Sequence, residues 1–342
     1  MDAIAYKTVI GLDIGQHTVK AVRAARRGDA TAVTPLESLR VPPGMGPAET
    51  ASLIGRWLDQ QGIRREPCVV GIRGLSVLFQ TLALPPQDPR PADQAVAMEI
   101  ARLSEISSDQ MRYGYVPISG TDETRRFLLA LVRADKAEEA LQVPREAGAD
   151  VVEAAPAAAA AFHAAVRPEA GGLTAVADIG LAGTDVAIGG AAGLRFARSF
   201  GLGGQYFTEA LAKARRMTVS QAEPAKIAAG LEGAEAGARE ALAGAADAWA
   251  AEFASCLSIY KSFFPNPDDQ PVRLVLTGGG SRLKGLERRL AGALGVEVRT
   301  LAALPGQAGS DEAPAYAVAC GLALIGAGRA GPTISLLPPD LR

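Results

Sequence analysis

One arrangement of hydrophobic and polar positions occurs twice along the chain. In each copy, three runs rich in β-branched and other apolar residues are separated by short turns, which is typical of three consecutive strands. The strands are expected at residues 8–15, 17–24 and about 31–41 in the first copy, and at 174–180, 184–189 and 194–200 in the second. The first strand of each copy ends in Asp-Ile-Gly, with the aspartates at positions 13 and 178. Asp-x-Gly alone is common in turns, but its repetition in one context predicts a duplicated lobe.

The region between the two copies has a different pattern. Strands are expected at 68–72, 77–84, 111–118 and 127–133, and helices at 92–103 and 134–147. We interpret residues 68–148 as a small α+β subdomain inserted into the first lobe. The remaining boundaries are then 1–67 for the first part of the first lobe, 149–172 for its completion, 173–330 for the second lobe and 331–342 for an extended tail.

Helical patterns dominate after the second copy. Helices are expected at 205–217, at 219–264 as one long alanine-rich element, at 283–294 and at 314–327, with strands at 273–277 and 296–301. Pro265 and Pro267 end the long helix. The apolar run from Ala315 to Gly328 is shorter than the ~20 residues of a membrane span, so a buried helix is expected there.

The composition favours a cytoplasmic globular protein with more than one core. The 342 residues exceed the ~250–300 at which a single core stops growing. A hydrophobic content of 48% with 21% charged residues excludes global disorder, and a net charge of −2 argues against a large nucleic-acid-binding surface. The three cysteines lack CxxC spacing and the N-terminus lacks a signal-peptide pattern, so neither a disulfide framework nor secretion is expected.

Glycine is abundant, with 38 residues, and its placement predicts a nucleotide site. An Asp-Ile-Gly turn places a carboxylate beside backbone N–H groups, which form an anion-binding nest for phosphates, and the carboxylate can hold Mg²⁺ through water. A further cluster at Gly278, Gly279 and Gly280 lets backbone lie against an adenine or ribose. Each loop alone reads as a structural turn. Three such loops with a duplicated hairpin favour a cleft that grips a nucleotide from both lobes.

These residues resemble the actin-like superfamily. The segments at 11–20 and 177–188 are similar to its two phosphate loops, and the segment at 276–290 to its adenosine motif. The insertion in the first lobe indicates the FtsA-like branch. Within it, the segments at 200–211, 222–226 and 313–324 resemble the PilM family of type IV pilus assembly, with the cytoplasmic domain of the type II secretion protein GspL also similar. The resemblance implies an α/β, ribonuclease H-like duplicated fold with two lobes around a nucleotide cleft.

The resemblance also implies a role for individual residues around ATP and Mg²⁺. Asp13 and Asp178 would organise Mg²⁺, through water. The residues that would surround the β- and γ-phosphates are Gly15, Gln16, His17, Thr18 and Lys20, with Gly180 and Thr184 on the other lobe. Those that would border the ribose and base are Gly203, Gly204, Glu223, Lys226, Gly279, Gly280 and Ser281. Gln16 and His17 could equally be solvated turn residues, and Glu223 and Lys226 an exposed helical pair.

Two departures from the family pattern bear on catalysis. Gly183 stands where relatives usually carry threonine, which removes one hydroxyl from the phosphate site. Ala155 stands where many relatives have a residue that positions the attacking water, and Glu153 is off register for that role. Loss of a water-positioning group leaves binding intact and slows hydrolysis. We therefore expect a nucleotide-binding scaffold or switch with weak or absent ATPase activity, and we assign no catalytic residue.

The C-terminal tail carries a second resemblance. Its sequence Ile-Ser-Leu-Leu-Pro-Pro is similar to the segment at the start of PilN, the membrane partner that docks on PilM in a groove between the first lobe and the inserted subdomain. Apolar residues spaced along an extended peptide suit such docking: Ile334, Leu336, Leu337 and Pro338. The tail is therefore interpreted as a PilN-like segment, in a PilM–PilN fusion or a GspL-like protein whose membrane helix lies beyond residue 342. The alternative is a frayed, proline-rich C-terminus.

The partners and location that follow from the resemblance are those of an assembly scaffold. They are inner-membrane PilN- or GspM-type proteins, the assembly ATPase, and self-association through the tail, with a cytoplasmic location peripheral to the inner membrane and no nucleic acid. Two other functions stay open. A small-molecule kinase of the same superfamily would need a catalytic aspartate, for which the sequence offers no clear candidate. An FtsA-like filament protein would usually end in a basic amphipathic helix, unlike this tail.

Overall fold

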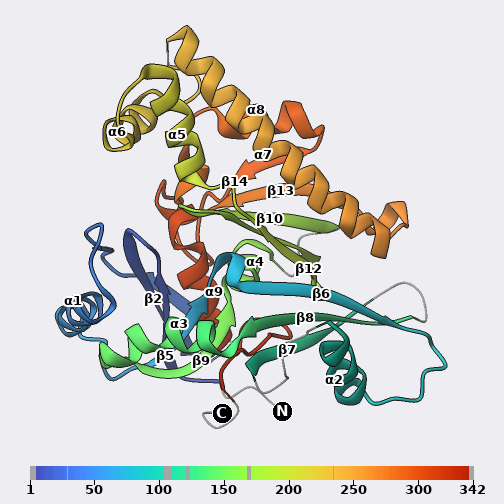
Figure 1. Cartoon of the computed structure of the whole chain (residues 1–342). Coiled ribbons are helices and arrows are strands. Elements are labelled where there is room, and N and C mark those ends of the chain that lie inside the picture. The colour runs from blue at the N-terminus through green and yellow to red at the C-terminus, as the bar shows by residue number, and fades with distance from the viewer. Residues whose placement is uncertain are drawn as a thin grey trace.

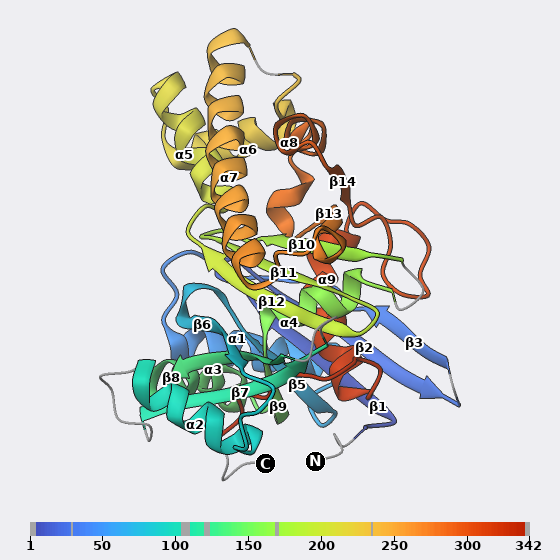
Figure 2. The ribbon, with the colours of Figure 1, turned by 90° about the vertical axis from the view of Figure 1, so that its right-hand side faces the viewer.

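The computed structural model describes residues 5–28, 30–103, 110–119, 124–167, 171–233 and 235–338, and each of its two lobes is built on one mixed sheet (Figures 1 and 2). The first-lobe sheet has the order β3-β2-β1-β5-β9, with β4 paired to β2. Its strands are β1 (Thr8–Ile14), β2 (Thr18–Arg27), β3 (Ala30–Pro35), β4 (Leu39–Arg40), β5 (Pro67–Ile72) and β9 (Asp150–Pro156). The single strand expected at 31–41 is two strands, β3 and β4, which both pair with β2.

The second-lobe sheet repeats this topology in the order β12-β11-β10-β13-β14. Its strands are β10 (Leu173–Ile179), β11 (Thr184–Gly190), β12 (Gly193–Phe200), β13 (Pro271–Thr277) and β14 (Glu297–Thr300). In both sheets the first three strands form an antiparallel meander, and two later strands add in parallel next to its first strand. The predicted duplication is confirmed.

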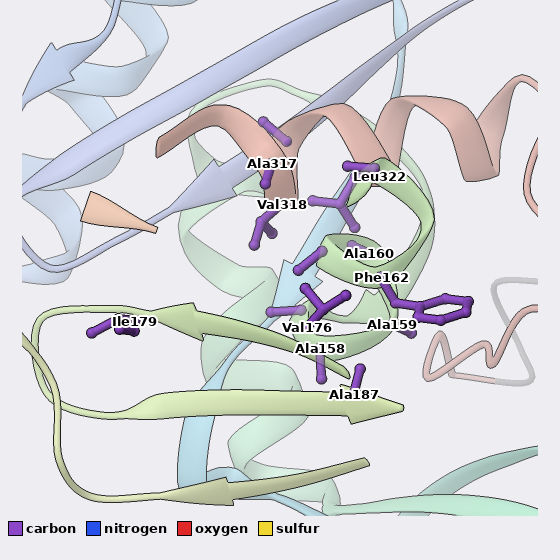
Figure 3. Packing of buried hydrophobic residues seen from close by; sticks show 14 of the residues in the cluster. Ala158, Ala159, Ala160, Phe162, Val176, Ile179, Ala187, Ala317, Val318 and Leu322 are labelled. Carbon is purple, nitrogen blue, oxygen red and sulfur yellow. The ribbon is translucent and has the colours of Figure 1, made fainter. Parts of the chain in front are cut away.

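Two helices made mostly of small residues lie between the lobes. Helix α9 (Ala317–Gly326) packs on the first-lobe sheet, α4 (Ala157–Ala165) packs on the second-lobe sheet, and the helices contact each other (Figures 1 and 3). The helix expected at 314–327 begins with a 3-10 turn at Ala313–Tyr316. Helix α9 packs closely on β1: a β-carbon at Gly11 of β1 would stand 2.0 Å from the carbonyl oxygen of Ala319 in α9. Small side chains thus join the two sheets at short range.

A third sheet, in the order β6-β8-β7, forms a subdomain beside the first lobe (Figure 1). Its elements are β6 (Val77–Leu84), β7 (Met111–Ile118), β8 (Arg125–Arg133) and α2 (Ala92–Leu103), all close to the predicted positions. Val96 and Ile100 of α2 pack with Leu129 of β8 in a small separate core. The short loop to β6 contains a 3-10 turn at Gly74–Ser76.

Two elements expected in the insertion belong to the first lobe instead. Strand β5 pairs in parallel with β1 and β9, and helix α3 (Ala134–Glu146) packs against α1 (Pro47–Gln60), which the sequence pattern did not single out. Strand β5 is a short, continuous apolar run, which is typical of a parallel strand buried on both faces. Such an apolar run does not indicate whether the strand joins the first-lobe sheet or the sheet of the inserted subdomain.

The helices of the second lobe are α5 (Gly204–Arg215), α6 (Val219–Ala229), α7 (Ala236–Phe263) and α8 (Leu286–Leu294). Helices α7 and α8 contact β12 and β14 of the sheet, whereas α5 packs on α7 and α6 packs on α5, farther from the sheet (Figure 2). The single helix expected at 219–264 is wrong: α6 ends at Gly230, which has a φ of 59° and whose β-carbon would stand 2.6 Å from Lys284 Cβ. Glycine is required there, and it stops the helix. None of the described helices is long and apolar enough to cross a membrane.

Candidate functional site

The two Asp-Ile-Gly motifs form the same turn at matching ends of the two sheets. Asp13 is at the end of β1 and Asp178 at the end of β10, and both carboxylates are almost fully buried. The Gly15 N–H donates to Thr18 O at 2.9 Å, and the Gly180 N–H donates to Gly183 O at 2.9 Å. The duplicated sequence thus folds into duplicated loops.

The glycines at positions 203 and 204 pack the second loop against helix α5. The Gly204 N–H donates to Gly180 O at 2.8 Å. A β-carbon at Gly203 would stand 2.5 Å from Leu181 O and 2.6 Å from Gly183 N, so only glycine fits. This contact fixes the N-terminus of α5 beside the loop.

The third glycine cluster follows β13 and packs on the end of β10. Gly278 has a φ of 83°, and its β-carbon would stand 2.4 Å from Ile179 O. Gly279 and Gly280 begin a 3-10 turn, in which the Ser281 hydroxyl donates to Gly278 O at 2.7 Å. Gly279 has open space where a side chain would project. The cluster therefore presents bare backbone to the space between the lobes.

The loops surround one open cavity of about 1120 Å³. The predicted site residues that line it are Asp13, Gly15, Gln16, His17, Thr18, Lys20, Asp178, Gly180, Gly204, Glu223, Lys226, Gly279, Gly280 and Ser281. Ile227, which is 61% exposed, and Leu301 add apolar surface. The volume slightly exceeds the usual range of about 300–1,000 Å³ for small-molecule and cofactor sites, so the space is large enough for a nucleotide. Lobe duplication brings together residues that are far apart in sequence.

Two predicted residues do not line the cavity. Gly203 is covered by the second loop, as described above. Thr184 is buried in β11, where its hydroxyl donates to Leu202 O at 2.6 Å and accepts from Trp249 Nε1 at 2.9 Å. The Thr184 hydroxyl therefore supports the loop from behind, in place of the phosphate contact that the resemblance implies.

Lys226 and Glu223 occupy a network that is more buried than an exposed helical pair. The Lys226 ammonium donates to Gly204 O at 3.1 Å, Thr208 Oγ1 at 2.9 Å and Glu223 Oε2 at 2.8 Å. Lys226 is 6% exposed. Its three N–H donors are all used, so it ties α6 to the start of α5.

Arg73 is a cavity residue that no sequence motif marks. It follows β5 and reaches into the cavity, where its guanidinium binds both buried aspartates. Nε donates to Asp13 Oδ1 at 2.5 Å, Nη2 to Asp13 Oδ2 at 2.6 Å, and Nη1 to Asp178 Oδ2 at 3.2 Å. Thr277 completes the shell by donating to Asp178 Oδ1 at 2.9 Å. A single arginine in a turn has no motif around it, so only the fold shows this role.

The charges around Arg73 hold it ionised. Burial would lower the pKa of the Arg73 guanidinium, but Asp13 and Asp178 outweigh burial and raise that pKa above its usual value. Asp185 of β11 lies nearby, and its carboxylate accepts from Ser199 Oγ at 2.6 Å. Burial raises the pKa of Asp185, partly offset by the Ser199 hydrogen bond and the Arg73 charge. The acidic cluster thus has one permanent cation at its centre.

Arg73 occupies the space in which Asp13 and Asp178 were predicted to organise Mg²⁺ through water. Mg²⁺ requires octahedral oxygen ligands at about 2.0–2.1 Å. Here both carboxylates already bind the guanidinium, and the second oxygen of Asp178 accepts from Thr277.

The C-terminal tail lies between β9 of the first lobe and β7 of the inserted subdomain. The Leu336 N–H donates to Ala154 O at 2.8 Å, and Ser335 Oγ donates to Glu153 Oε1 at 2.6 Å. On the other side, a β-carbon at Gly114 would stand 2.4 Å from Ser335 O. The predicted docking residues Ile334, Leu336, Leu337 and Pro338 are all buried, while residues 339–342 lie outside the described chain. We call the surface formed by Gly114, Glu153 and Ala154 the tail site.

A comparison with protein families gives a direct match. The family described as type IV pilus assembly protein PilM matches residues 11–327. The chain belongs to this PilM family. The comparison with curated proteins found no match.

Solved structures show that this PilM-family chain shares its fold with actin-like proteins. A PilM–PilN type IV pilus biogenesis complex is 24% identical, with a TM-score of 0.78, and the match covers 93% of this chain and 98% of that one. The ethanolamine utilization protein EutJ from Carboxydothermus hydrogenoformans is 16% identical, with coverages of 94% and 93% and a TM-score of 0.55. MreB5 of Spiroplasma citri bound to ADP is 14% identical, with coverages of 92% and 94% and a TM-score of 0.52. The predicted α/β actin-like fold is confirmed.

The residues considered for water positioning lie away from the cavity of this PilM-family chain. Glu153 Oε1 accepts from Ser335 Oγ and from its neighbour's N–H at 2.7 Å, so its carboxylate faces the tail site. Ala155 is buried and has no polar side-chain atom. Glu153 is therefore placed for contact with the tail and is absent from the cavity lining.

Proposed function

We propose that this chain is an ATP-binding cytoplasmic scaffold of type IV pilus or type II secretion machinery that holds an extended Ile-Ser-Leu-Leu-Pro-type segment of an inner-membrane partner. Membership of the PilM family supports the pilus assignment. The resemblance to GspL keeps the secretion machine as the alternative setting. A location peripheral to the inner membrane follows from a membrane-anchored partner.

The observation that carries this proposal is the seated tail. Its backbone donates to β9 through Leu336, and its apolar side chains Ile334 and Leu337 are 1% exposed. Backbone pairing gives such a peptide its affinity, and pockets for spaced apolar side chains give it specificity. These contacts support a tail site that takes one extended, apolar segment whose backbone passes close to Gly114.

A PilN-type protein is the partner that suits this chemistry. The similar complex contains PilM together with PilN, and the tail resembles the start of PilN. In this proposal the tail itself is the PilN-like segment, seated in its own chain. A partner's segment, or the tail of a second copy, would occupy the same site. GspM-type proteins and the assembly ATPase are further partners within the same proposal.

A nucleotide in the interlobe cavity is the second part of the proposal. Two phosphate-type turns, a third bare glycine turn and the apolar Ile227 face one space of suitable size. The chain that is similar in fold, MreB5, is described as bound to ADP. We propose ATP as the ligand, with the phosphates at Gly15 and Gly180 and the base beside Gly279. Hydrolysis is proposed to be weak or absent, because Glu153 serves the tail.

Peptide binding to a chain without its tail tests the docking. Removal of residues 333–342 should create a site for an added Ile-Ser-Leu-Leu-Pro-Pro peptide, which the intact chain should not bind, as measured by isothermal titration calorimetry. In the shortened chain, Gly114→Val should abolish binding, because its side chain takes the place of the peptide backbone. Leu78→Val, at an exposed position of the same small sheet, is the matched control. Absence of peptide binding after the deletion would refute the docking proposal.

A further inference from the structure

A cation that belongs to the chain stands between the two aspartates that the actin-like fold would use for a metal. The Arg73 guanidinium spans Asp13 from the first lobe and Asp178 from the second. The contact with Asp13 is bidentate, which is the strongest geometry for an arginine–carboxylate pair. Both carboxylates are buried, at 1% and 2% exposure, so each depends on this partner.

The guanidinium cannot be removed by deprotonation, since arginine stays charged in proteins. Displacing it would leave two buried carboxylates that a single hydrated Mg²⁺ would have to bridge in an octahedral shell. Thr277 already holds one oxygen of Asp178. The position between the two aspartates is thus filled by a cation that is fixed by covalent connection to β5.

Arg73 also keeps donors for a ligand. Its guanidinium has five N–H groups, and three of them are used in the bonds to Asp13 and Asp178. The two that remain are on Nη1 and Nη2. The side chain is 27% exposed and lines the cavity, and a β-carbon at Gly180 would stand 3.7 Å from Nη1. The spare donor on Nη1 therefore lies beside the second phosphate-type turn, and the one on Nη2 lies on the Asp13 side.

We propose that Arg73 takes the place of the divalent cation: it neutralises Asp13 and Asp178, and it offers its two remaining N–H groups to the phosphates of a nucleotide that binds without metal. This inference rests on the proposed nucleotide site. Arginine suits the role, because its planar group pairs with carboxylates and phosphates at the same time. Because Arg73 connects aspartates from both lobes, the charge that meets the phosphates also holds the two loops together.

Metal binding in the absence of nucleotide tests whether Arg73 fills the metal position between Asp13 and Asp178. Mn²⁺ titrations of the full chain, followed by electron paramagnetic resonance, should show no specific Mn²⁺ site in the wild type. Arg73→Ser should gain one site, and Asp178→Asn added to that variant should remove it. Arg23→Ser is the matched control: Arg23 pairs with Glu66 in the same lobe, outside the cavity lining. A Mn²⁺ site in the wild type that Asp13→Asn removes, or a folded Arg73→Ser without a site, would overturn the inference.

Nucleotide binding tests whether Arg73 supports phosphate binding without metal. For this, ATP is titrated either in excess Mg²⁺ or in EDTA. The wild-type dissociation constant should agree within about threefold between the two buffers, whereas Arg73→Ser should bind at least about tenfold more weakly in EDTA and recover with Mg²⁺. This wild-type comparison needs no variant, so it decides the question even if Arg73→Ser does not fold. A wild type that loses tenfold or more in EDTA would overturn the inference.

The two experiments separate this inference from the proposed function. If ATP bound to the wild type in neither buffer, the nucleotide function and the phosphate role of Arg73 would both fail. The Mn²⁺ titration would still decide independently whether Arg73 fills the metal position. If ATP bound only with Mg²⁺, the nucleotide function would stand and the inference would fall.

Discussion

Gly321 of α9 lies directly against the backbone of Ala160 in α4: a β-carbon at position 321 would stand 1.7 Å from the Ala160 carbonyl oxygen. This contact is at the crossing of the two helices that join the lobes (Figure 3). Ala160 and its neighbours in α4 are small and fully buried. The distance between the lobes is therefore set by how closely two helix backbones approach.

The first prediction follows from this crossing. Gly321→Ala should lower the free energy of unfolding by about 2 kcal/mol or more, because the added methyl overlaps backbone that cannot move aside cheaply. Gly244→Ala, at an open position in α7, should instead stabilise by about 0.5–1 kcal/mol through helix propensity. Urea denaturation measures both. Equal effects of the two changes would contradict the packing at the crossing.

The sequence predicts those parts of the fold that have a local signature. The Asp-Ile-Gly turns are short and repeated, so both lobes and most of the cavity lining follow from them. The boundary of the insertion does not, because β5 has an apolar run that suits either sheet. The break after α6 depends on Gly230 meeting Lys284, a contact between residues distant in sequence. Arg73 is hidden for the same reason: its partners, Asp13 and Asp178, are 60 and 105 positions away.

Thr184 gives a second prediction, which separates a supporting role from a phosphate contact. Thr184→Val should lower the free energy of unfolding by about 1–3 kcal/mol, since Trp249 Nε1 and Leu202 O would lose a buried hydrogen-bond partner. Thr184→Ser keeps the hydroxyl and should recover most of this loss. Under native conditions Thr184→Val should still bind ATP within about threefold of the wild type. A selective loss of ATP affinity in a stable Thr184→Val would restore the phosphate role.

The burial of His163 leads to a prediction of how the free energy of unfolding depends on pH. Its Nε2 is buried without a hydrogen-bond partner, and burial lowers its pKa from 6.5 to about 4. The folded chain therefore binds fewer protons than the unfolded chain between these values, so the His163 contribution is present above pH 6.5 and is lost as the pH falls. At pH 5 the loss should be at most about 2 kcal/mol relative to pH 7.

The variant His163→Gln isolates the contribution of the His163 imidazole to this pH dependence. His163→Gln carries no charge at any pH, so its unfolding free energy should fall less between pH 7 and pH 5 than that of the wild type, as measured by urea denaturation at each pH. Parallel curves for the two proteins would mean that His163 is not the group responsible.

A nucleotide site between the lobes is tested most directly by ATP binding to a chain whose cavity is filled by one side chain. Gly279→Phe should place its ring in the cavity without a clash, since a β-carbon there meets no atom within 4 Å, whereas Gly292→Phe adds the same ring at an open position of α8 outside the lining. Isothermal titration calorimetry should show ATP binding to the wild type and to Gly292→Phe, and a loss of at least about tenfold in affinity for Gly279→Phe. No binding to the wild type, or equal binding to all three, would contradict a nucleotide site between the lobes.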